Sequence, residues 1–214
     1  MTTSTDKITP GSIPENYHQV LDWKITQSNK QLVLLNLLAI PWLAICVGIF
    51  MLWKIAWNNI RNFITTNGAV PAAGAQTFVV VNWALAILAG VAVTVVLHEL
   101  IHGITMRRYG AKPKYGVLWS GLMFYATAAG FAFRRNDYLK VALAPLLVLS
   151  LIVLVVLAMP ISANLATLLI ICGSFNAAGA IGDLWITRVV LRYPAHAYVI
   201  DERDGVRIFM PEEP

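Results

Sequence analysis

Apolar residues are concentrated in four long runs, and polar residues gather between and beyond them. The runs are roughly Leu32–Trp53, Phe78–Met106, Leu139–Met159 and Leu165–Val190. A helix needs about 20 apolar residues to cross the hydrocarbon core of a bilayer, and each run is long enough. Polar residues precede the first run and no small-residue cleavage site closely follows it, so we expect a retained span rather than a signal peptide.

Basic residues give these spans a predicted orientation. With a cytoplasmic N-terminus, 14 of the 16 Lys and Arg residues lie on the inner side and only Lys54 and Arg61 lie outside. Positively charged flanks mark the cytoplasmic side of membrane helices. We therefore expect both termini, and the segment between spans two and three, to be cytoplasmic.

The segments outside the spans differ in character. Residues 54–65 have helical apolar spacing, which fits either an interfacial helix or an extension of the first span. Residues 66–77 are predicted to form an outer loop. The loop from Ala111 to Arg135 is nearly uncharged and aromatic in its middle and interrupted by glycines, which is typical of two or three short strands. After residue 193, two apolar stretches flank Asp204-Gly205 and predict a hairpin.

The expected fold class is an all-α polytopic membrane protein with four transmembrane helices, a short cytoplasm-side β element between helices two and three, and a C-terminal hairpin. Residues 1–31 form a cytoplasmic segment, 32–193 the transmembrane domain with its core at 78–190, and 194–214 a cytoplasmic tail.

Composition supports a membrane protein. Of the 214 residues, 58% are apolar and 13% are charged, and the mean hydropathy is +0.67. Soluble domains contain about 45–50% apolar and about 25% charged residues. The net charge of +5 reflects the membrane flanks, so a lipid bilayer and not nucleic acid is the expected partner. Cys46 and Cys172 lie in apolar runs, which argues against a disulfide framework.

The second span contains ionisable residues, which are costly inside a membrane and are therefore functional candidates. His98-Glu99-Leu100-Ile101-His102 is a His-Glu-x-x-His pattern. Residues four apart share one helix face, so both imidazoles can bind one metal ion such as zinc, with Glu99 beside it. Zinc lowers the pKa of a bound water towards ~7, and the carboxylate can accept its proton. The alternative is a buried polar cluster that joins helices by hydrogen bonds.

A third ligand is expected from span four. Asp183 is the only other acidic residue within a span, and it precedes Arg188 by five residues, as His102 precedes Arg107. The two side chains should therefore lie at similar depth. Asn176 is seven residues before Asp183, hence on the same helix face. It is predicted either to stabilise an oxyanion or bound water, or to make an interhelical hydrogen bond.

These residues resemble the intramembrane zinc metalloproteases of the site-2 protease type, especially small bacterial membrane proteins described as zincin peptidases. The resemblance covers roughly residues 78–190. It implies that His98, His102 and Asp183 hold Zn²⁺, that Glu99 is the general base, and that the protein lies in a bacterial cytoplasmic membrane. Two positions depart from the family pattern, because Asn176 is not shortly followed by proline and Leu184 follows Asp183 where the family has glycine.

The expected function is that of a metallopeptidase that cuts a membrane protein or peptide substrate near the cytoplasmic face. By the same resemblance, the Tyr115–Phe133 segment engages an unwound substrate by strand addition. The candidate substrate-binding residues are Val117, Trp119, Leu122 and Phe124. A non-catalytic metal-binding transporter or scaffold is the alternative, and two imidazoles with a carboxylate suit several divalent metals besides zinc. The sequence does not determine the oligomeric state.

Overall fold

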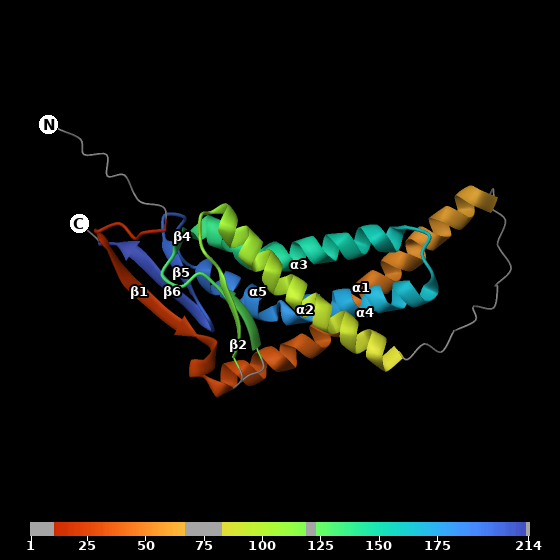
Figure 1. Cartoon of the computed structure of the whole chain (residues 1–214), viewed down its shortest axis with the longest axis horizontal. Coiled ribbons are helices and arrows are strands. Elements are labelled where there is room, and N and C mark those ends of the chain that lie inside the picture. The colour runs from red at the N-terminus through yellow and green to blue at the C-terminus, as the bar shows by residue number, and fades with distance from the viewer. Residues whose placement is uncertain (1–10, 67–82, 119–122, 213–214) are drawn as a thin grey trace. The chain divides into compact units, whose positions relative to one another are not determined.

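The structure, a computed structural model, describes residues 11–66, 83–118 and 123–212. Four helical segments in it are long and apolar enough to cross a membrane, as the sequence predicts. They are α1 (Asn29–Thr66), α2 (Trp83–Arg108), α3 (Arg135–Ala158), and α4 (Ala163–Gly179) followed by α5 (Ile181–Val190) (Figure 1).

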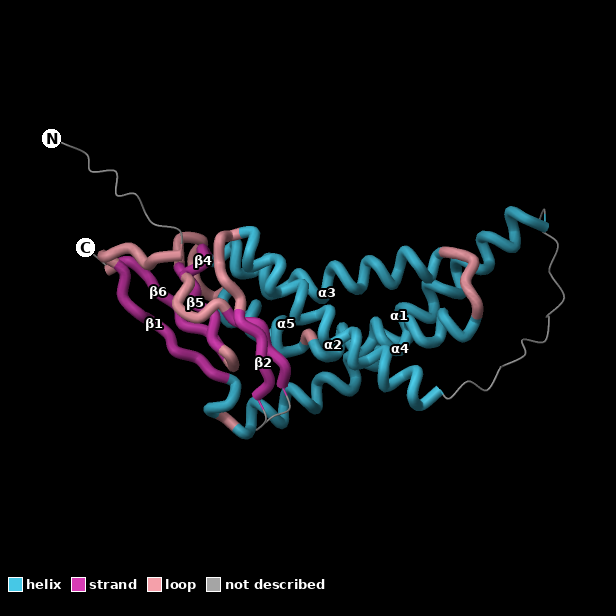
Figure 2. The backbone as a smooth tube through the Cα atoms, viewed as in Figure 1, coloured by secondary structure: helices cyan, strands magenta, loops and turns pink. Residues whose placement is uncertain are grey.

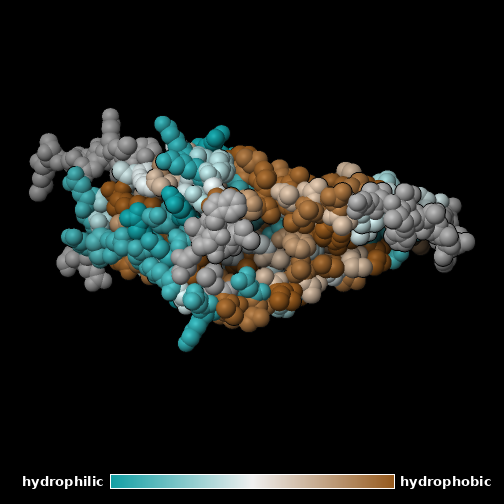
Figure 3. Space-filling view, turned by 60° about the horizontal axis from the view of Figure 1, so that its bottom comes forward, coloured by the Kyte–Doolittle hydropathy of each residue, from teal (hydrophilic) through white to brown (hydrophobic). Residues whose placement is uncertain are grey.

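Large apolar side chains on these helices point outward. Leu88 of α2 is 67% exposed and Leu147 of α3 is 62% exposed. In the space-filling view, hydrophobic residues dominate the visible surface of the helices, and hydrophilic residues gather over the strands (Figure 3). A soluble monomer rarely exposes apolar patches of this extent. The surface of the helices is therefore that of a membrane protein.

The chain forms two compact units. Unit 1 contains the described residues up to Leu34, Glu99–Ala144 and the described residues from Gly182 onward. Unit 2 contains the described residues of Leu35–His98, together with Pro145–Ile181.

Unit 1 contains a four-stranded antiparallel sheet in the order β1-β6-β5-β4 (Figure 2). Its strands are β1 (Tyr17–Lys24), β4 (Ala132–Arg134), β5 (Tyr198–Glu202) and β6 (Gly205–Pro211). The hairpin β5–β6 matches the prediction for the tail. Strand β1 was not predicted from the sequence; it follows the polar N-terminus and pairs with β6 from Tyr17↔Pro211 to Lys24↔Gly205. The two predicted terminal segments thus meet in one sheet.

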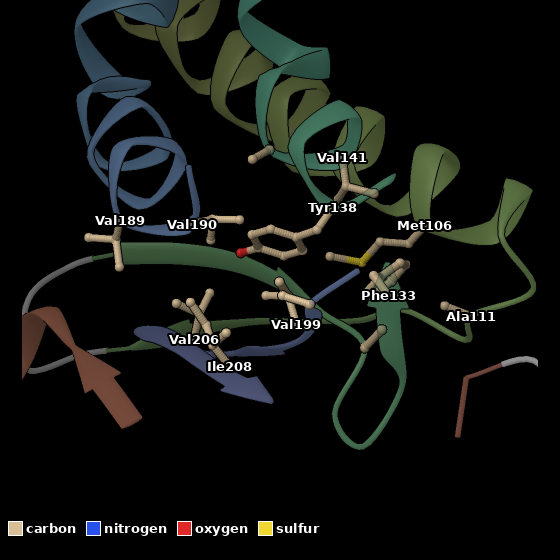
Figure 4. Close-up of a cluster of buried hydrophobic side chains, with 13 residues drawn as sticks. Met106, Ala111, Phe133, Tyr138, Val141, Val189, Val190, Val199, Val206 and Ile208 are labelled. Carbon is tan, nitrogen blue, oxygen red and sulfur yellow. The ribbon is translucent and has the colours of Figure 1, made fainter. Parts of the chain in front are cut away.

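Apolar side chains explain why this sheet forms. On β1, Leu21 and Trp23 pack against the main core of unit 1, whereas Asp22 between them is exposed. This alternation is the pattern of a half-buried strand. The core also contains Met106, Phe133, Tyr138 and Val199, and Figure 4 shows these residues converging from α2, β4, α3 and β5. The sheet is therefore packed against the ends of the helices in unit 1.

A separate two-stranded hairpin also belongs to unit 1. It pairs β2 (Lys114–Leu118) with β3 (Met123–Thr127) in antiparallel register. Together with β4 it accounts for the short strands predicted between spans two and three. The all-α class is thus accurate for the spans but understates the sheet content of unit 1.

In unit 2, α1, α3 and α4 pack through a core of mostly apolar residues. Phe50 of α1 and Val153 of α3 both lie within 3.2 Å of the position that a Cβ would take at Gly173 of α4. Glycine therefore permits the close approach of these side chains. The indole Nε1 of Trp42 adds a hydrogen bond to the Ala177 carbonyl oxygen at 2.8 Å. Cys46 and Cys172 are both free and buried, as expected.

The segment after the first span continues α1 without interruption to Thr66, so the extension and not a separate interfacial helix is observed. This continuity brings Lys54 and Arg61 to the end of α3. Lys54 Nζ donates to the carbonyl oxygens of Leu157 at 3.1 Å and Met159 at 3.0 Å, and Arg61 donates to that of Ala158 at 3.2 Å. The last carbonyls of a helix lack partners within it and carry partial negative charge. The two predicted outer cations therefore cap α3.

We expect Lys54→Met to lower the free energy of unfolding by about 1–3 kcal/mol, because it removes the Lys54 donor from the buried carbonyl of Leu157. Lys30→Met is the matched control, since Lys30 lies on the same helix but is exposed. The measurement is denaturant unfolding in detergent, followed by tryptophan fluorescence. Equal stability of the two variants would contradict the capping role.

Candidate metal centre

Helix α2 positions the three residues of the His-Glu-x-x-His pattern. It is helical without interruption from Trp83 to Arg108, so His98 and His102 lie one turn apart on one face. His102 is buried, and His98 and Glu99 are partly buried. Glu99 directly follows His98 in the helix and lies three residues before His102. The structure thus gives the motif the helical geometry that its spacing predicts.

A backbone carbonyl determines the tautomer of His102. Its Nδ1 lies 2.9 Å from the carbonyl oxygen of Val141 on α3. A carbonyl oxygen can only accept a hydrogen bond, so Nδ1 carries the proton and donates it. In a neutral imidazole the other nitrogen, Nε2, then has its lone pair available for a metal. This Nε2 faces Oδ2 of Asp183 at 3.5 Å.

The side-chain amide of Asn176 determines the tautomer of His98. Its Nδ1 lies 2.9 Å from Oδ1 of Asn176, which makes Nδ1 the donor and Nε2 the nitrogen suited to a metal. Asn176 is only 3% exposed, and its Nδ2 donates to the Pro145 carbonyl oxygen at 3.4 Å. In the structure, Asn176 therefore contacts a candidate ligand. Its predicted role at an oxyanion or water stays a prediction.

The three predicted ligands come together. One ligand atom each from His98, His102 and Asp183 can be chosen so that all three lie within 4.8 Å of one another. Ligands at about 2.0–2.1 Å from tetrahedral zinc are separated by about 3.4 Å, close to the separation between His102 and Asp183. Two imidazoles with protonated Nδ1 and one carboxylate are also a suitable donor set for catalytic zinc. The residues present therefore fit a zinc ion.

The fourth span is broken at Ala180, between Asn176 and Asp183. The Ala180 N–H donates to the carbonyl oxygens of Asn176 and Ala178, and its φ and ψ of −70° and 3° end α4 there. The fourth span is therefore interrupted by one residue and is not the continuous helix expected, although Asn176 faces His98 and Asp183 faces His102, both on α2. Because of the break, Asp183 lies in the first turn of α5. The positive end of that helix dipole favours a carboxylate at this position.

The predicted substrate-binding residues are only partly described. Val117 of β2 and Phe124 of β3 lie opposite each other in the hairpin, and Phe124 is 50% exposed. Trp119 and Leu122 lie outside the described residues. Nearby, the hydroxyl of Tyr115 on β2 occupies the position that a Cβ would take at Gly103, the residue after His102. Hairpin β2–β3 thus packs directly against α2 beside the motif, and Gly103 makes that contact possible.

Sequence reasoning missed a buried acid in unit 1. Asp201 of β5 is 7% exposed, and its Oδ1 accepts a hydrogen bond from the Tyr138 hydroxyl at 2.8 Å. Burial raises the pKa of Asp201 to about 7, while hydrogen bonds from Tyr138 and Thr127 and the proximity of His102 act to lower it. The signal available in the sequence was the run Tyr198-Val199-Ile200, which is apolar on both strand faces and so typical of a buried strand.

The role of the Val141 carbonyl was also missed, because a backbone group leaves no residue-type signal in a sequence. Its partner His102 could be identified, but the contact depends on how α2 and α3 pack. The hydrogen bond from Tyr138 to Asp201 likewise depends on packing and was missed.

Comparison with known proteins gives one match. A family model described as "Putative zincin peptidase" matches residues 91–198. The matched range begins in α2 and includes the His-Glu-x-x-His pattern, all of α3, α4 and α5, and the first residue of β5. No curated protein and no solved structure matches the chain. The family model covers half of the chain and every predicted metal ligand, so this protein belongs to the putative zincin peptidase family.

Proposed function

We propose that this protein is a zinc-dependent endopeptidase of the membrane, which cuts membrane protein substrates near the cytoplasmic face. One observation carries the proposal. Both histidines of the motif donate Nδ1–H to an acceptor, which makes Nε2 the nitrogen able to bind a metal, and His102 Nε2 faces Asp183. A purely structural polar cluster would not require both imidazoles to adopt the same metal-binding tautomer.

The mechanism assigns one role to each group of the centre. His98, His102 and Asp183 would hold the metal, and Asn176 and the Val141 carbonyl orient the imidazoles. Zinc, when bound, would supply Lewis acidity that activates water and polarises a peptide carbonyl. Glu99 accepts the proton of the attacking water and then delivers it to the amine nitrogen that leaves when the peptide bond breaks. Its position between the two histidines of the motif suits this transfer.

Substrate binding is assigned to the hairpin β2–β3. A peptide in a helix has its carbonyl groups hydrogen-bonded, so it must unwind before hydrolysis. A strand edge can hold such an extended segment through backbone hydrogen bonds. Support comes from the Tyr115 contact with Gly103, which packs the hairpin against α2 beside His102. The exposed Phe124 offers an apolar side chain for a hydrophobic substrate.

The proposed orientation places both termini, the sheet of unit 1 and the metal centre on or near the cytoplasmic side of a bacterial cytoplasmic membrane. The distribution of basic residues supports it, with 14 on the assigned inner side. Arg107 and Arg108 end α2 just after the motif, and Arg188 lies in the last turn of α5 after Asp183. These positions are consistent with a site within about two helical turns of the inner surface.

We expect Glu99→Gln to retain stoichiometric zinc and lose cleavage of a model membrane substrate, because it removes the general base but no ligand. His98→Ala should lose both zinc and cleavage. Metal content of the purified protein and a gel-based cleavage assay check this. His196→Ala is the control, since this exposed histidine of the tail should keep both properties. Zinc binding by wild type without any cleavage would favour a transporter or scaffold, and wild type without bound metal would reject the enzyme.

For Asn176→Ala we expect zinc affinity to fall about 10–100-fold, the usual cost of losing the partner that orients a histidine ligand. Asn176→Asp keeps an acceptor for His98 Nδ1–H and should retain most of the affinity. Competition with a fluorescent chelator measures both. An unchanged affinity in Asn176→Ala combined with a lower kcat would instead assign Asn176 to the reacting carbonyl.

Proline in the hairpin tests strand addition. We expect Val117→Pro or Phe124→Pro to abolish cleavage while zinc stays bound, because proline lacks the backbone N–H and distorts an edge strand. Val117→Ala and Phe124→Ala keep the backbone N–H and should retain most activity. Cleavage rate and metal content are measured for all four variants. Unchanged cleavage by the proline variants would contradict the role of the hairpin.

A further inference from the structure

Helix α3 contains Pro145 in its interior, within an apolar segment where other apolar residues would form a regular helix. Pro145 is among the largest fully buried side chains, below 2% exposure. Proline has no backbone N–H, so residue 145 cannot donate the usual helical hydrogen bond to the carbonyl four residues earlier. In α3 that carbonyl belongs to Val141.

The carbonyl released by Pro145 is the one that binds His102. The His102 Nδ1–H donates to Val141 O at 2.9 Å. In an uninterrupted helix this oxygen would already accept from the backbone N–H of residue 145, in a bond directed along the helix axis. Removing that donor leaves the lone pairs of the oxygen available to a side chain from a neighbouring helix. A freed carbonyl in an apolar helix also requires a partner, and His102 satisfies it.

The carbonyl oxygen of Pro145 helps to orient the other histidine, His98, through Asn176. It accepts from Asn176 Nδ2 at 3.4 Å, and Asn176 Oδ1 accepts from His98 Nδ1 at 2.9 Å. Each candidate histidine ligand is thus oriented through the same turn of α3, His102 through the oxygen that Pro145 frees and His98 through Asn176.

We propose that Pro145 is a positioning residue of the metal centre, whose missing N–H frees the Val141 carbonyl to hold His102 in its metal-binding tautomer. The inference rests on the metal centre of the proposed function and does not depend on peptide cleavage. It gives α3, which contributes no ligand of its own, a defined part in zinc binding.

The role predicts a specific effect of restoring the N–H. In Pro145→Val, which keeps an apolar side chain of similar volume, the new backbone N–H competes with His102 for the Val141 oxygen. We expect zinc affinity to fall about tenfold, as is usual when a partner of a histidine ligand is lost. The carbonyl of residue 145 is kept, so the bond to Asn176 and hence the support of His98 should remain.

Three readouts in detergent micelles test this. Chelator competition gives zinc affinity, thermal unfolding of the metal-free protein gives stability, and ¹⁵N-histidine NMR reports each Nδ1–H. Pro41→Val is the matched control, since Pro41 lies inside α1 and is exposed. Pro145→Ala is the second variant, which adds the same N–H with a smaller side chain. The expected result is weaker zinc binding in both Pro145 variants, loss of the protected His102 Nδ1–H and retention of that of His98.

Wild-type zinc affinity in Pro145→Val, or a His102 Nδ1–H signal that persists in it, would overturn the proposal. So would a loss of affinity that only follows a lower unfolding midpoint, because that is the behaviour of a merely structural proline. Failure of the proposed function looks different: wild type would bind zinc and cut no substrate, while the contrast between Pro145→Val and Pro41→Val would remain.

Discussion

His98 and His102 lie in an apolar helix, where water is scarce. Their N–H groups therefore need hydrogen-bond acceptors from the protein itself. An unpaired buried polar group costs several kcal/mol in such surroundings. His102 meets the requirement with the Val141 carbonyl and His98 with the Asn176 amide. Both solutions use Nδ1, so satisfying the hydrogen bonds and preparing Nε2 for a metal are the same event.

The surrounding helices supply those acceptors and consequently depart from regular helical structure. Helix α3 contains a buried proline one turn after Val141, and the fourth span breaks at Ala180 so that Asp183 lies in the first turn of a new helix. A regular span would keep each carbonyl within its own helical ladder and would leave no helix start for a carboxylate. These irregularities lie close to the metal centre, as is common where function rather than stability shapes the backbone.

Unit 1 and unit 2 are packed in different ways. The helices of unit 2 expose large apolar side chains and pack through small residues such as Gly173. Unit 1 combines the motif end of α2 with a sheet whose core is apolar and whose face seen in Figure 3 is mostly hydrophilic. Asp201 lies in this sheet. It is the only acidic residue among the buried side chains of the described part of the chain. The polar segments at the two ends of the chain are thus structural parts of the unit that holds His102 and Asp183.

The sequence by itself determined the four spans, the helical motif of His98, Glu99 and His102, and the choice of Asp183, because hydrophobic length, fixed helical spacing and the rarity of acids in spans are local properties. It also indicated short strands between spans two and three, and the β5–β6 hairpin, through glycine and turn residues. Only the tertiary structure decided the pairing of β1 with β6, the break at Ala180, the burial of Asp201 and the partners of the two imidazoles. The strand pairing, the burial of Asp201 and the imidazole partners depend on contacts between distant segments, and the sequence does not mark a backbone carbonyl such as that of Val141 as an acceptor.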